Sequence, residues 1–502
     1  MNDQFDELAN GMAQTARRRQ ALRRCGAGLA LLTRTLLGVA VIALFAGPAT
    51  ANDFRRGPLI DLSDPDALAA CRSNGAEKET SVAVNSTDPN NIVAIWWGGL
   101  GSGIVTAVTL DGGKKWQQVV VPGVTLCTGG NFAGAVDPWV SFAPNGDLYQ
   151  ISLAFDRPPI SPHAGILVSK STDGGLHWGK PVTLFETADQ RFLPDKPSIT
   201  ADPTDARFAY AAWDRSDNGN RGAGMFTRTT DSGQTWEAVR AIYDPSTKNN
   251  GTIGHQIIVL PNGVLVDSFT EFKNSDTGAN KDAVLSVIRS TDKGQTWTAP
   301  VRAAIVPIFD ANDPDTGFPV INAGSFPPLF GVAVDSHNGN LYAVWEDTRF
   351  SDGQYGGIAF AQSTDDGFTW SEPIRLNKTP DNIAPANRQA FLPSVAVAAD
   401  STIGVTYYDF RFKDPNAGLP TDSWLVYCHP AATTPANNPA SWGNEVRLTD
   451  TSFDMEKTPT GSGAYFVGDY EALATAGNDF LAVWSQPRDM DPDSVFFRRV
   501  GR

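Results

Sequence analysis

The chain has 502 residues, 41% of them hydrophobic and 19% charged, and it contains 47 Gly, 34 Pro, 27 Phe, 13 Trp and 10 Tyr. This composition is typical of a turn-rich, mostly β globular protein, and it excludes a disordered or collagen-like chain. The formal net charge of −15 disfavours nucleic acid and anionic lipid as partners, because both repel an acidic surface.

Residues 1–51 are predicted to be an export signal. The arginine-rich segment ARRRQALRR precedes an apolar run from Leu36 to Ala46, and small residues follow as far as Ala51. This order predicts a cut after Ala51, and the paired arginines resemble a twin-arginine signal. We therefore expect the protein in the periplasm or outside the cell. The alternative is an uncleaved membrane anchor, which Arg34 disfavours because it interrupts an already short apolar stretch.

An octet recurs along the rest of the chain. It reads STDGGLHW at 171–178, TTDSGQTW at 229–236, STDKGQTW at 290–297 and STDDGFTW at 363–370, with a degenerate copy, TLDGGKKW, at 109–116. The five copies follow one another at nearly constant intervals, of which the last is the longest. A regular period of about 60 residues indicates stacked supersecondary units.

Each unit is predicted to be a four-stranded antiparallel sheet whose last hairpin is the octet. Two β-like runs precede each octet, with turns such as Pro144–Gly146 between them, and the second run ends on an aromatic residue. That aromatic recurs at Trp97, Phe155, Trp213, Phe269, Trp345, Tyr408 and Trp484. The count predicts an all-β propeller of seven blades, with six as the alternative if one unit is an appendage.

The last unit reaches only its third strand. A strand near Gly57–Leu62, from the start of the mature chain, could supply the fourth and close the ring, which would remove the exposed sheet edges. The predicted organisation is therefore a signal at 1–51, an N-terminal segment with this strand at 52–78, and the propeller at 79–502.

The octet has a structural explanation. Its Asp can accept hydrogen bonds from the turn backbone, its Gly can take a positive φ, and its Trp can pack between neighbouring sheets. A calcium loop is the alternative, but each octet offers at most one or two carboxylates where calcium needs about six oxygens. The residues assigned this structural role are Asp111, Asp173, Asp231, Asp292, Asp365, Trp116, Trp178, Trp236, Trp297 and Trp370.

A binding site is expected on the opposite face. In a four-stranded meander, the loops after the second strands and the links between blades lie on one face, away from the octets. Ionisable side chains gather there, and they suit an anionic or polyhydroxylated ligand such as a glycan. The candidates are Asp137, Asp195, Lys196, Asp214, Arg215, His255, Glu346, Asp347, Arg349, Arg388, Asp409, Arg411 and Tyr465. The alternative interpretation is that each Asp and Arg pair fastens a loop to the next blade.

The cysteines and histidines indicate which disulfides and metal sites the chain can form. Cys71 and Cys127 precede the first strands of adjacent blades, so a disulfide between them is predicted, whereas Cys428 reads as a buried apolar residue. The positions of the five histidines in the sequence do not match the spacing of zinc ligands. We expect no metal, no cofactor, no membrane span after signal removal and a monomer.

The octets match the Asp-box, or bacterial neuraminidase repeat, and the mature chain resembles the secreted sialidase-like propellers that carry it. The resemblance implies retaining glycoside hydrolysis by a Tyr nucleophile, with a Glu and an Asp assisting and three Arg holding the substrate carboxylate. On this chain it suggests Tyr465 as nucleophile, Glu346 and Asp347 as its partners, and three clamping arginines. Those arginines are Arg349, Arg388 and Arg411.

The chain also departs from that pattern. Lys78-Glu79-Thr80 stands where the family carries Arg-Ile-Pro, and WWGGLGSG at 96–103 lacks the Asp expected on the next loop. The rival interpretation is a non-catalytic propeller that serves as a binding or assembly platform.

Overall fold

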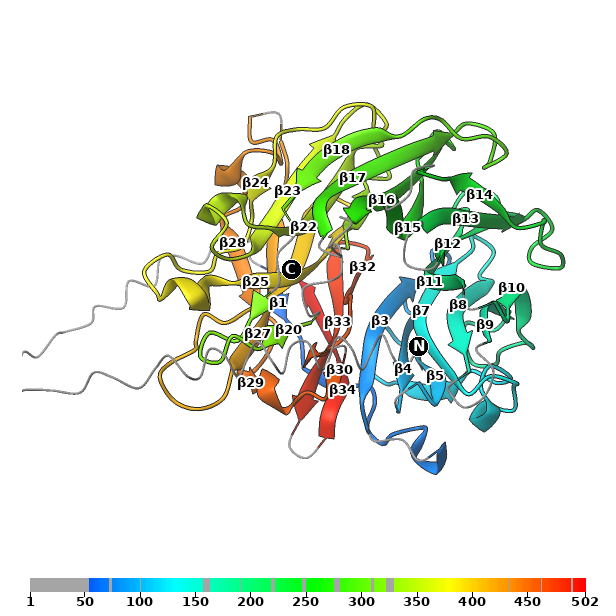
Figure 1. Cartoon of the computed structure of the whole chain (residues 1–502), viewed down its shortest axis with the longest axis horizontal. Helices are drawn as coiled ribbons and strands as arrows, with labels where there is room; N and C mark the ends of the chain where they lie inside the picture. Colours follow the sequence, from blue (N-terminus) through cyan, green and yellow to red (C-terminus); the bar gives the residue numbers. More distant parts are fainter. Residues whose placement is uncertain are drawn as a thin grey trace, which may run out of the picture. The chain divides into compact units, whose positions relative to one another are not determined.

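Strands form almost all of the regular structure. The computed structural model describes the chain except for residues 1–53, 72–74, 100, 157–162, 190, 218–221, 246–249, 275–279, 308–310, 322–328, 432, 462 and 489–490. The predicted export signal lies outside the described residues. All described residues belong to one unit, Phe54–Arg502 (Figure 1).

Seven sheets follow one another along the chain, each with its strands paired antiparallel in sequence order. Sheet 1 has β3 (Glu77–Val84), β4 (Ile92–Gly98), β5 (Gly103–Thr109) and β6 (Gln117–Val120). Sheet 2 has β7 (Gly134–Phe142), β8 (Leu148–Phe155), β9 (Ala164–Ser171) and β10 (Val182–Thr187). Sheet 3 has β11 (Phe192–Ala201), β12 (Ala209–Asp217), β13 (Gly222–Thr229) and β14 (Arg240–Tyr243). Sheet 4 has β15 (Asn250–Val259), β16 (Leu265–Asn274), β17 (Asn280–Ser290) and β18 (Val301–Val306).

The last three sheets differ in detail from this scheme. Sheet 5 has β21 (Gly331–Val334), β22 (Leu341–Asp347), β23 (Gly357–Ser363) and β24 (Ile374–Arg375). Sheet 6 has β25 (Ala390–Val397), β26 (Ile403–Asp409), β27 (Pro420–Cys428) and β28 (Asn444–Arg447), and β29 (Phe453–Asp454) also pairs with β27. Sheet 7 has β32 (Ala472–Ala476), β33 (Asp479–Arg488) and β34 (Asp491–Gly501), followed by β1 (Arg55–Arg56) and β2 (Ile60–Asp61). Six short 3-10 helices stand in the described links: Ala69–Cys71, Leu126–Thr128, Arg349–Ser351, Pro385–Arg388, Pro439–Ser441 and Met455–Lys457.

The second strand of each sheet is buried on both of its faces. Strand β4, IVAIWWG, is buried at every position, as is β26, IGVTYYD. The seven recurrent aromatics all lie in these strands. Each main core cluster joins neighbouring sheets; Trp96 of sheet 1, for example, shares a cluster with Phe497 of sheet 7. The long apolar runs are therefore explained by sheets that pack face to face.

The first strands of the seven sheets meet one another in order. Contacts join β3 to β7, β7 to β11, β11 to β15, β15 to β21, β21 to β25, β25 to β32, and β32 back to β3. The first strands therefore lie innermost, and sheet 7 neighbours sheet 1.

The two ends of the described chain meet in sheet 7. Arg55 and Arg56 pair with Gly501 and Val500, and Ile60 and Asp61 pair with Phe497 and Phe496. The segment predicted at Gly57–Leu62 thus contributes β2, while β1 lies just before it. Together they cover the otherwise free edge of β34.

The octets form the hairpins between third and fourth strands. In STDGGLHW, Ser171 Oγ donates to Asp173 Oδ1 at 2.8 Å, the Gly175 N–H donates to Ser171 Oγ at 2.9 Å, and the His177 N–H donates to Asp173 Oδ1 at 2.9 Å. The Asp carboxylate in the other four octets accepts bonds from its own turn in the same way.

The octets share a face with the turns between first and second strands. Asn91, beside such a turn in sheet 1, donates to the Gly174 carbonyl in the octet of sheet 2 at 3.0 Å. Lys293, in the octet of sheet 4, pairs with Asp202 of sheet 3 at 2.6 Å. Trp178 is buried against sheet 1, where its Nε1 donates to Thr106 Oγ1 at 3.4 Å.

An eighth, small sheet joins two distant links. It orders β19 (Ala311–Asn312), β20 (Pro319–Val320), β31 (Ala464–Tyr465) and β30 (Thr460–Gly461). Strands β19 and β20 come from the link between sheets 4 and 5, which accounts for the longer interval between the octets of those two sheets. Strands β30 and β31 come from the link between sheets 6 and 7.

Cys71 and Cys127 form a disulfide, with their Cα atoms 5.8 Å apart. It joins the links that lead into sheets 1 and 2. Cys428 is buried in the core between sheets 5 and 6, and burial raises the pKa of its thiol to about 12. In the part of the chain that the structure describes, we find no helix with the length and apolarity needed to span a bilayer.

Replacing Trp178 with Ala is expected to lower the free energy of unfolding by about 3–5 kcal/mol, because the side chain fills the contact between two sheets. Urea unfolding monitored by circular dichroism measures this change. Leu110→Ala, in the octet of sheet 1 and 54% exposed, is the control and should change stability by less than about 0.5 kcal/mol. Equal effects of the two substitutions would contradict a packing role for the octet Trp.

Candidate functional site

A cavity of about 230 Å³ lies among the innermost strands. Every one of the seven first strands contributes to its wall, at Thr80–Val82, Trp139, Lys196–Ser198, Gly254–Gln256, Gly331–Val332, Leu392–Val395 and Ala472–Leu473. The small sheet contributes Ala311 and Val320, and Ile321 follows directly after β20. We call this space the central cavity.

A β-bulge recurs in five of the first strands where they reach the cavity. The pairing register shifts beside Glu79, Asp137, Lys196, Gly254 and Leu392. All five have a left-handed backbone, with φ of 57°, 52°, 43°, 75° and 50° in that order. Four of them are not glycine, so each of these four stores strain of about 1–3 kcal/mol. Such bulges redirect a side chain out of the regular strand alternation.

The bulge residues of sheets 1, 2 and 3 meet in one buried ionic cluster. Lys196 Nζ lies 2.7 Å from Asp137 Oδ1 and 3.3 Å from Glu79 Oε1. It also lies 2.5 Å from Asp469 Oδ2, in the link before sheet 7. We call Glu79, Asp137, Lys196 and Asp469 the central cluster. The Lys196, Glu79 and Asp137 side chains are at most 9% exposed.

Burial and mutual repulsion set the protonation of this cluster. Burial first and Asp137 second raise the pKa of Glu79 to about 7, although Lys196 acts to lower it. Burial likewise raises the pKa of Asp137 and of neighbouring Asp195, against the influence of Lys196. Burial acts to lower the pKa of Lys196, but Asp137, Asp469 and Glu79 outweigh it and raise that pKa. Lys196 is therefore charged, while Glu79 can gain or lose a proton near neutral pH.

The three carboxylates are close enough to bind a metal ion, because one oxygen of each lies within 4.8 Å of the others. The Lys196 ammonium group already bonds all three. This cation balances their charge where a metal would otherwise do so, and we assign no metal to the cluster.

Aromatic rings border the central cluster. Tyr470 and Trp139 both line the cavity, with ring centroids 5.7 Å apart. The Tyr470 hydroxyl donates to the Pro138 carbonyl at 3.3 Å, and Lys196 Nζ lies 5.9 Å from the Tyr470 ring centroid. Burial raises the pKa of Tyr470, with Glu79 and Asp137 adding to the effect. The site thus combines hydrogen-bonding charges with apolar ring surface.

His255 lies in the cavity wall beside the bulge of sheet 4. Its ring stacks on Phe269 at 4.5 Å, and its Nδ1 lies 2.7 Å from Asp267 Oδ2. Its Nε2 is 3.5 Å from Asp214 Oδ1. Burial acts to lower the pKa of His255, but Asp267 and Asp214 outweigh it and raise that pKa. Asp214 is itself held in place, because the Gly254 N–H donates to its Oδ2 at 2.7 Å.

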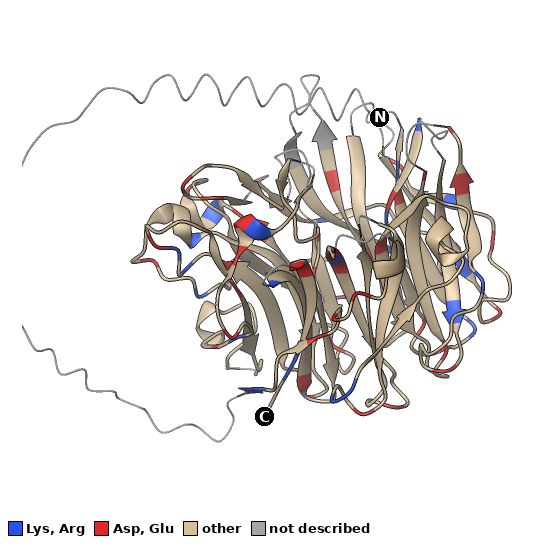
Figure 2. Cartoon of the chain, turned by 90° about the horizontal axis from the view of Figure 1, so that it is seen from below, with Lys and Arg blue, Asp and Glu red and all other residues tan. Residues whose placement is uncertain are grey.

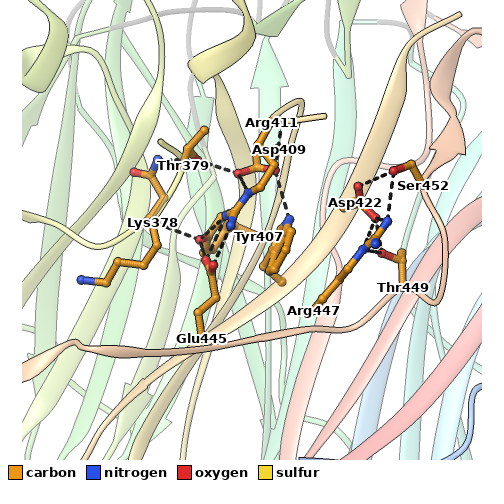
Figure 3. Close-up of polar contacts among 12 residues, drawn as sticks. Lys378, Thr379, Tyr407, Asp409, Arg411, Asp422, Glu445, Arg447, Thr449 and Ser452 are labelled. Carbon is orange, nitrogen blue, oxygen red and sulfur yellow. Dashed lines mark hydrogen bonds and ion pairs between the residues drawn. The ribbon is translucent and has the colours of Figure 1, made fainter. Parts of the chain in front are cut away.

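Two of the predicted clamping arginines lie in a repeated ion pair. Arg411 Nε donates to Asp409 Oδ2 at 2.7 Å, and its guanidinium also bonds Glu445 (Figure 3). The guanidinium carbon lies 3.6 Å from the centroid of the Trp424 ring. Arg349 Nε likewise donates to Asp347 Oδ2 at 2.7 Å. In both sheets, 5 and 6, the same carboxylate also accepts a bond from a Trp indole. These contacts match the alternative interpretation, a pair that fastens a loop.

The remaining candidates occupy several places. Arg388 Nε donates to the Ile383 carbonyl at 2.9 Å. Tyr465 lies in β31, where its ring packs on Phe318 at 4.7 Å, and Arg215 stacks on Phe192 at 5.0 Å. Among the described residues, the cavity wall includes none of Tyr465, Arg349, Arg388 and Arg411. It does include Glu346, whose Oε1 accepts a bond from the Leu392 N–H at 2.8 Å.

Sequence reasoning missed four residues of the site: Glu79, Asp469, Tyr470 and Trp139. A signal for the first was available. Glu79, Asp137 and Lys196 recur along the sequence with nearly the same period as the octets. The period alone could therefore have placed Glu79 beside two residues that were predicted. Asp469 and Tyr470 lie in a link that carries no repeat signal.

Charges of both signs are interspersed over the loops and strand ends of the described unit (Figure 2). Glu346, Asp469, Glu471, Lys196 and His255 all line the cavity. Glu79 and Asp137 bond Lys196 but do not line the cavity themselves. Burial raises the pKa of Glu471 to about 8.

No protein-family model and no curated protein matches the sequence. Among solved structures, the chain is similar to a protein of unknown function from Dyadobacter fermentans, with 14% identity over 89% of this chain and 99% of the other and a TM-score of 0.47. It is also similar to a Hadza microbial sialidase, with 15% identity over 82% of this chain and 73% of the other and a TM-score of 0.47. A third is the GH93 alpha-L-arabinofuranosidase of Fusarium graminearum, with 11% identity over 89% of this chain and 98% of the other and a TM-score of 0.44.

Replacing Lys196 with Met is expected to destabilise the protein by about 3–5 kcal/mol at pH 8, because buried carboxylates lose their cation. The loss should be smaller at pH 5. A carboxyl whose folded pKa is raised, as that of Glu79 is, destabilises the fold increasingly as pH rises from its unfolded pKa through its folded pKa. Urea unfolding at both pH values measures the difference.

Lys170→Met is the matched control, since Lys170 is partly exposed and pairs with Asp147 at 2.7 Å. Its loss should stay below about 1 kcal/mol at either pH. A loss for Lys196→Met that is equally small, or that does not depend on pH, would contradict the assigned charge state of the cluster.

Proposed function

We propose that the seven sheets form a closed seven-bladed propeller of the sialidase-like, Asp-box type. Three observations support this architecture. The innermost strands contact one another in cyclic order, β1 and β2 pair with the last strand β34, and the octets occupy the same hairpin in five sheets.

We propose that the protein acts on or recognises glycans in the central cavity. The observation that carries the proposal is the central cluster beside Tyr470 and Trp139. Carboxylates accept hydrogen bonds from sugar hydroxyls, while an aromatic ring packs against the apolar face of a sugar ring. The volume of about 230 Å³ lies below the range of about 300–1,000 Å³ usual for drug-sized ligands, which suits a small unit such as one terminal sugar.

The charge of the site favours a neutral sugar over an anionic one. Lys196 is already shared by three carboxylates, and Glu346 lies in the same wall. The three arginines that a sialoside carboxylate would need are engaged elsewhere or lie outside the wall. A neutral exo-glycosidase substrate therefore fits this site better than a sialic acid does.

Glu79 is the proposed titrating group of the site if the protein is an enzyme, and it acts on the cavity through Lys196, because Glu79 does not line the wall itself. With a pKa of about 7 it can gain or lose a proton near neutral pH. The backbone N–H of Asp137 donates to Glu79 Oε2 at 3.2 Å, which holds Glu79 beside Lys196.

A non-catalytic binding platform is the second candidate. The ion pairs Asp347–Arg349 and Asp409–Arg411 favour this candidate. Both arginines were expected to hold a substrate carboxylate, and each is instead paired with the Asp that ends the preceding strand. In this case the cavity would bind a glycan without turnover.

Purified protein should be assayed on neutral and sialylated fluorogenic glycosides. We expect turnover of a neutral substrate that declines above about pH 7, because Glu79 then loses its proton. Glu79→Gln and Asp137→Asn should each lower kcat/KM by about 100-fold or more. Asp381→Asn, at a carboxylate 72% exposed, should leave activity unchanged.

The outcomes separate the candidates. Glycan-array binding without turnover on any substrate would overturn the enzyme and support the platform. Turnover of a sialoside that Tyr465→Phe abolishes would instead restore Tyr465 as nucleophile and contradict the neutral-substrate proposal.

We also propose that the N-terminal signal at 1–51 directs export of the chain to the periplasm or beyond. The disulfide Cys71–Cys127 supports this proposal, since such bonds persist in oxidising compartments. Fractionation of cells that express the full chain should find a shortened protein outside the cytoplasm. Lysine in place of both Arg18 and Arg19 should retain it inside, and secretion unaffected by that change would contradict the twin-arginine assignment.

A further inference from the structure

The wall of the central cavity changes in polarity from one side to the other. Lys196 and Asp469 of the central cluster line it together with the rings of Tyr470 and Trp139. The link between sheets 4 and 5 also contributes to the wall, and each residue that it contributes is apolar. These residues, which we call the apolar wall, are Ala311, Val320, Ile321, Leu329 and Phe330.

The cyclic order of the sheets separates the two regions. The central cluster comes from sheets 1, 2 and 3 and from the link before sheet 7. The apolar wall lies on the side of sheets 5 and 6, because Phe330 directly precedes sheet 5 and Val320 shares a core cluster with Leu392 of sheet 6. Sheets 4 and 7 stand between these two groups of sheets. A ligand in the cavity therefore meets charged and aromatic groups on one side and apolar side chains on the other.

Hydrogen bonds from two other links hold the apolar wall in place. Val320 of β20 pairs with Tyr465 of β31, and the Ile321 N–H donates to the Tyr465 carbonyl at 2.7 Å. Gln389, just before sheet 6, forms two hydrogen bonds with the backbone of Asn312, of 2.8 and 2.7 Å. The backbone of Tyr465 thus fixes the position of the apolar wall.

Ile321 is the strained residue of this wall. Its backbone is left-handed, with φ of 79°, a conformation that a β-branched residue rarely adopts. The side chain is 6% exposed and belongs to the same core cluster as Val320 and Leu392. Glycine would take this conformation without strain, and strained residues concentrate at ligand sites. The presence of Ile here therefore indicates that the cavity needs an apolar side chain at this position.

The five side chains of the apolar wall can neither donate nor accept a hydrogen bond. Glu346 of sheet 5 lines the cavity on this side, and its Oε1 accepts the Leu392 N–H at 2.8 Å. It thereby fixes the bulge of sheet 6 and is not one of the residues of the apolar wall. A ligand hydroxyl placed against these five side chains would lose its water without gaining a partner, whereas a methyl group would gain contact.

We propose that the apolar wall selects a neutral sugar with a methyl group in place of the hydroxymethyl group, that is, a 6-deoxyhexose. This inference rests on the proposed recognition of glycans in the central cavity. The hydroxyls of the sugar bond the charged side of the cavity, and its methyl group packs against Val320 and Ile321. An N-acetyl group also ends in a methyl group, but its amide needs hydrogen-bond partners that these side chains lack.

Calorimetric titration of the purified protein with pairs of methyl glycosides that differ only at carbon 6 tests this preference. The pairs are methyl L-fucoside with methyl L-galactoside, methyl L-rhamnoside with methyl L-mannoside, and methyl D-quinovoside with methyl D-glucoside. Methyl N-acetyl-D-glucosaminide is a further ligand. We expect the deoxy member of at least one pair to bind at least about tenfold more tightly than its partner and than the N-acetyl sugar.

Val320→Thr keeps the shape of the side chain and adds a hydroxyl to the apolar wall. It should reduce the preference for the deoxy sugar to less than about threefold. If this variant does not fold, Leu329→Asn, at a half-buried position, replaces it with the same expectation. Val467→Thr is the matched control, since Val467 is fully buried in the same core cluster as Val320 but does not line the cavity. This control should keep the preference of the unaltered chain.

The outcomes distinguish this inference from the proposed function. Equal binding within every pair, or tighter binding of the hydroxymethyl or N-acetyl sugar, overturns the inference. The proposed function then still stands if Trp139→Ala, at a half-buried residue of the cavity wall, weakens the binding. An undiminished preference in the variant of the apolar wall also overturns the inference. If no sugar binds, the proposed function fails and the inference fails with it.

Discussion

Face-to-face packing of neighbouring sheets is the constraint on which the structure depends. A sheet between two others must bury both faces, so its second strand is apolar throughout, as in β4. The same demand places Trp178 against the sheet before its own. Because each sheet has two neighbours, the first strands are brought together, and one cavity receives side chains from all seven.

Backbone bulges, and not the regular alternation of side chains along a strand, place the ionic groups beside that cavity. Left-handed bulges turn Glu79, Asp137 and Lys196 toward one another, and the ammonium group of Lys196 is what allows three carboxylates to share a dry space. The central cluster is therefore both a stabilising ion network and a set of groups poised to titrate.

Much of the fold could be predicted because it repeats. The octets and the second-strand aromatics fix the order of the sheets, and the strand near Gly57–Leu62 follows from an incomplete last unit. The small sheet could not be predicted, since β20 and β31 pair across links far apart in sequence. For the site, Asp137, Lys196 and His255 follow from the period. Tyr470 and Asp469 do not, because they lie in a link that does not repeat. The bulges themselves could not be predicted either, since a bulge does not change the hydrophobic periodicity of a strand.

The recurrent bulges have a consequence for how this scaffold can vary. The left-handed position is specified by strand pairing, and it accepts Glu, Asp, Lys, Leu and Gly in five different sheets of one chain. Side-chain identity at these positions is thus separable from the fold that presents it. A designer could alter polarity at a handful of such positions and change which small molecule the cavity prefers, while the surrounding sheets keep their arrangement.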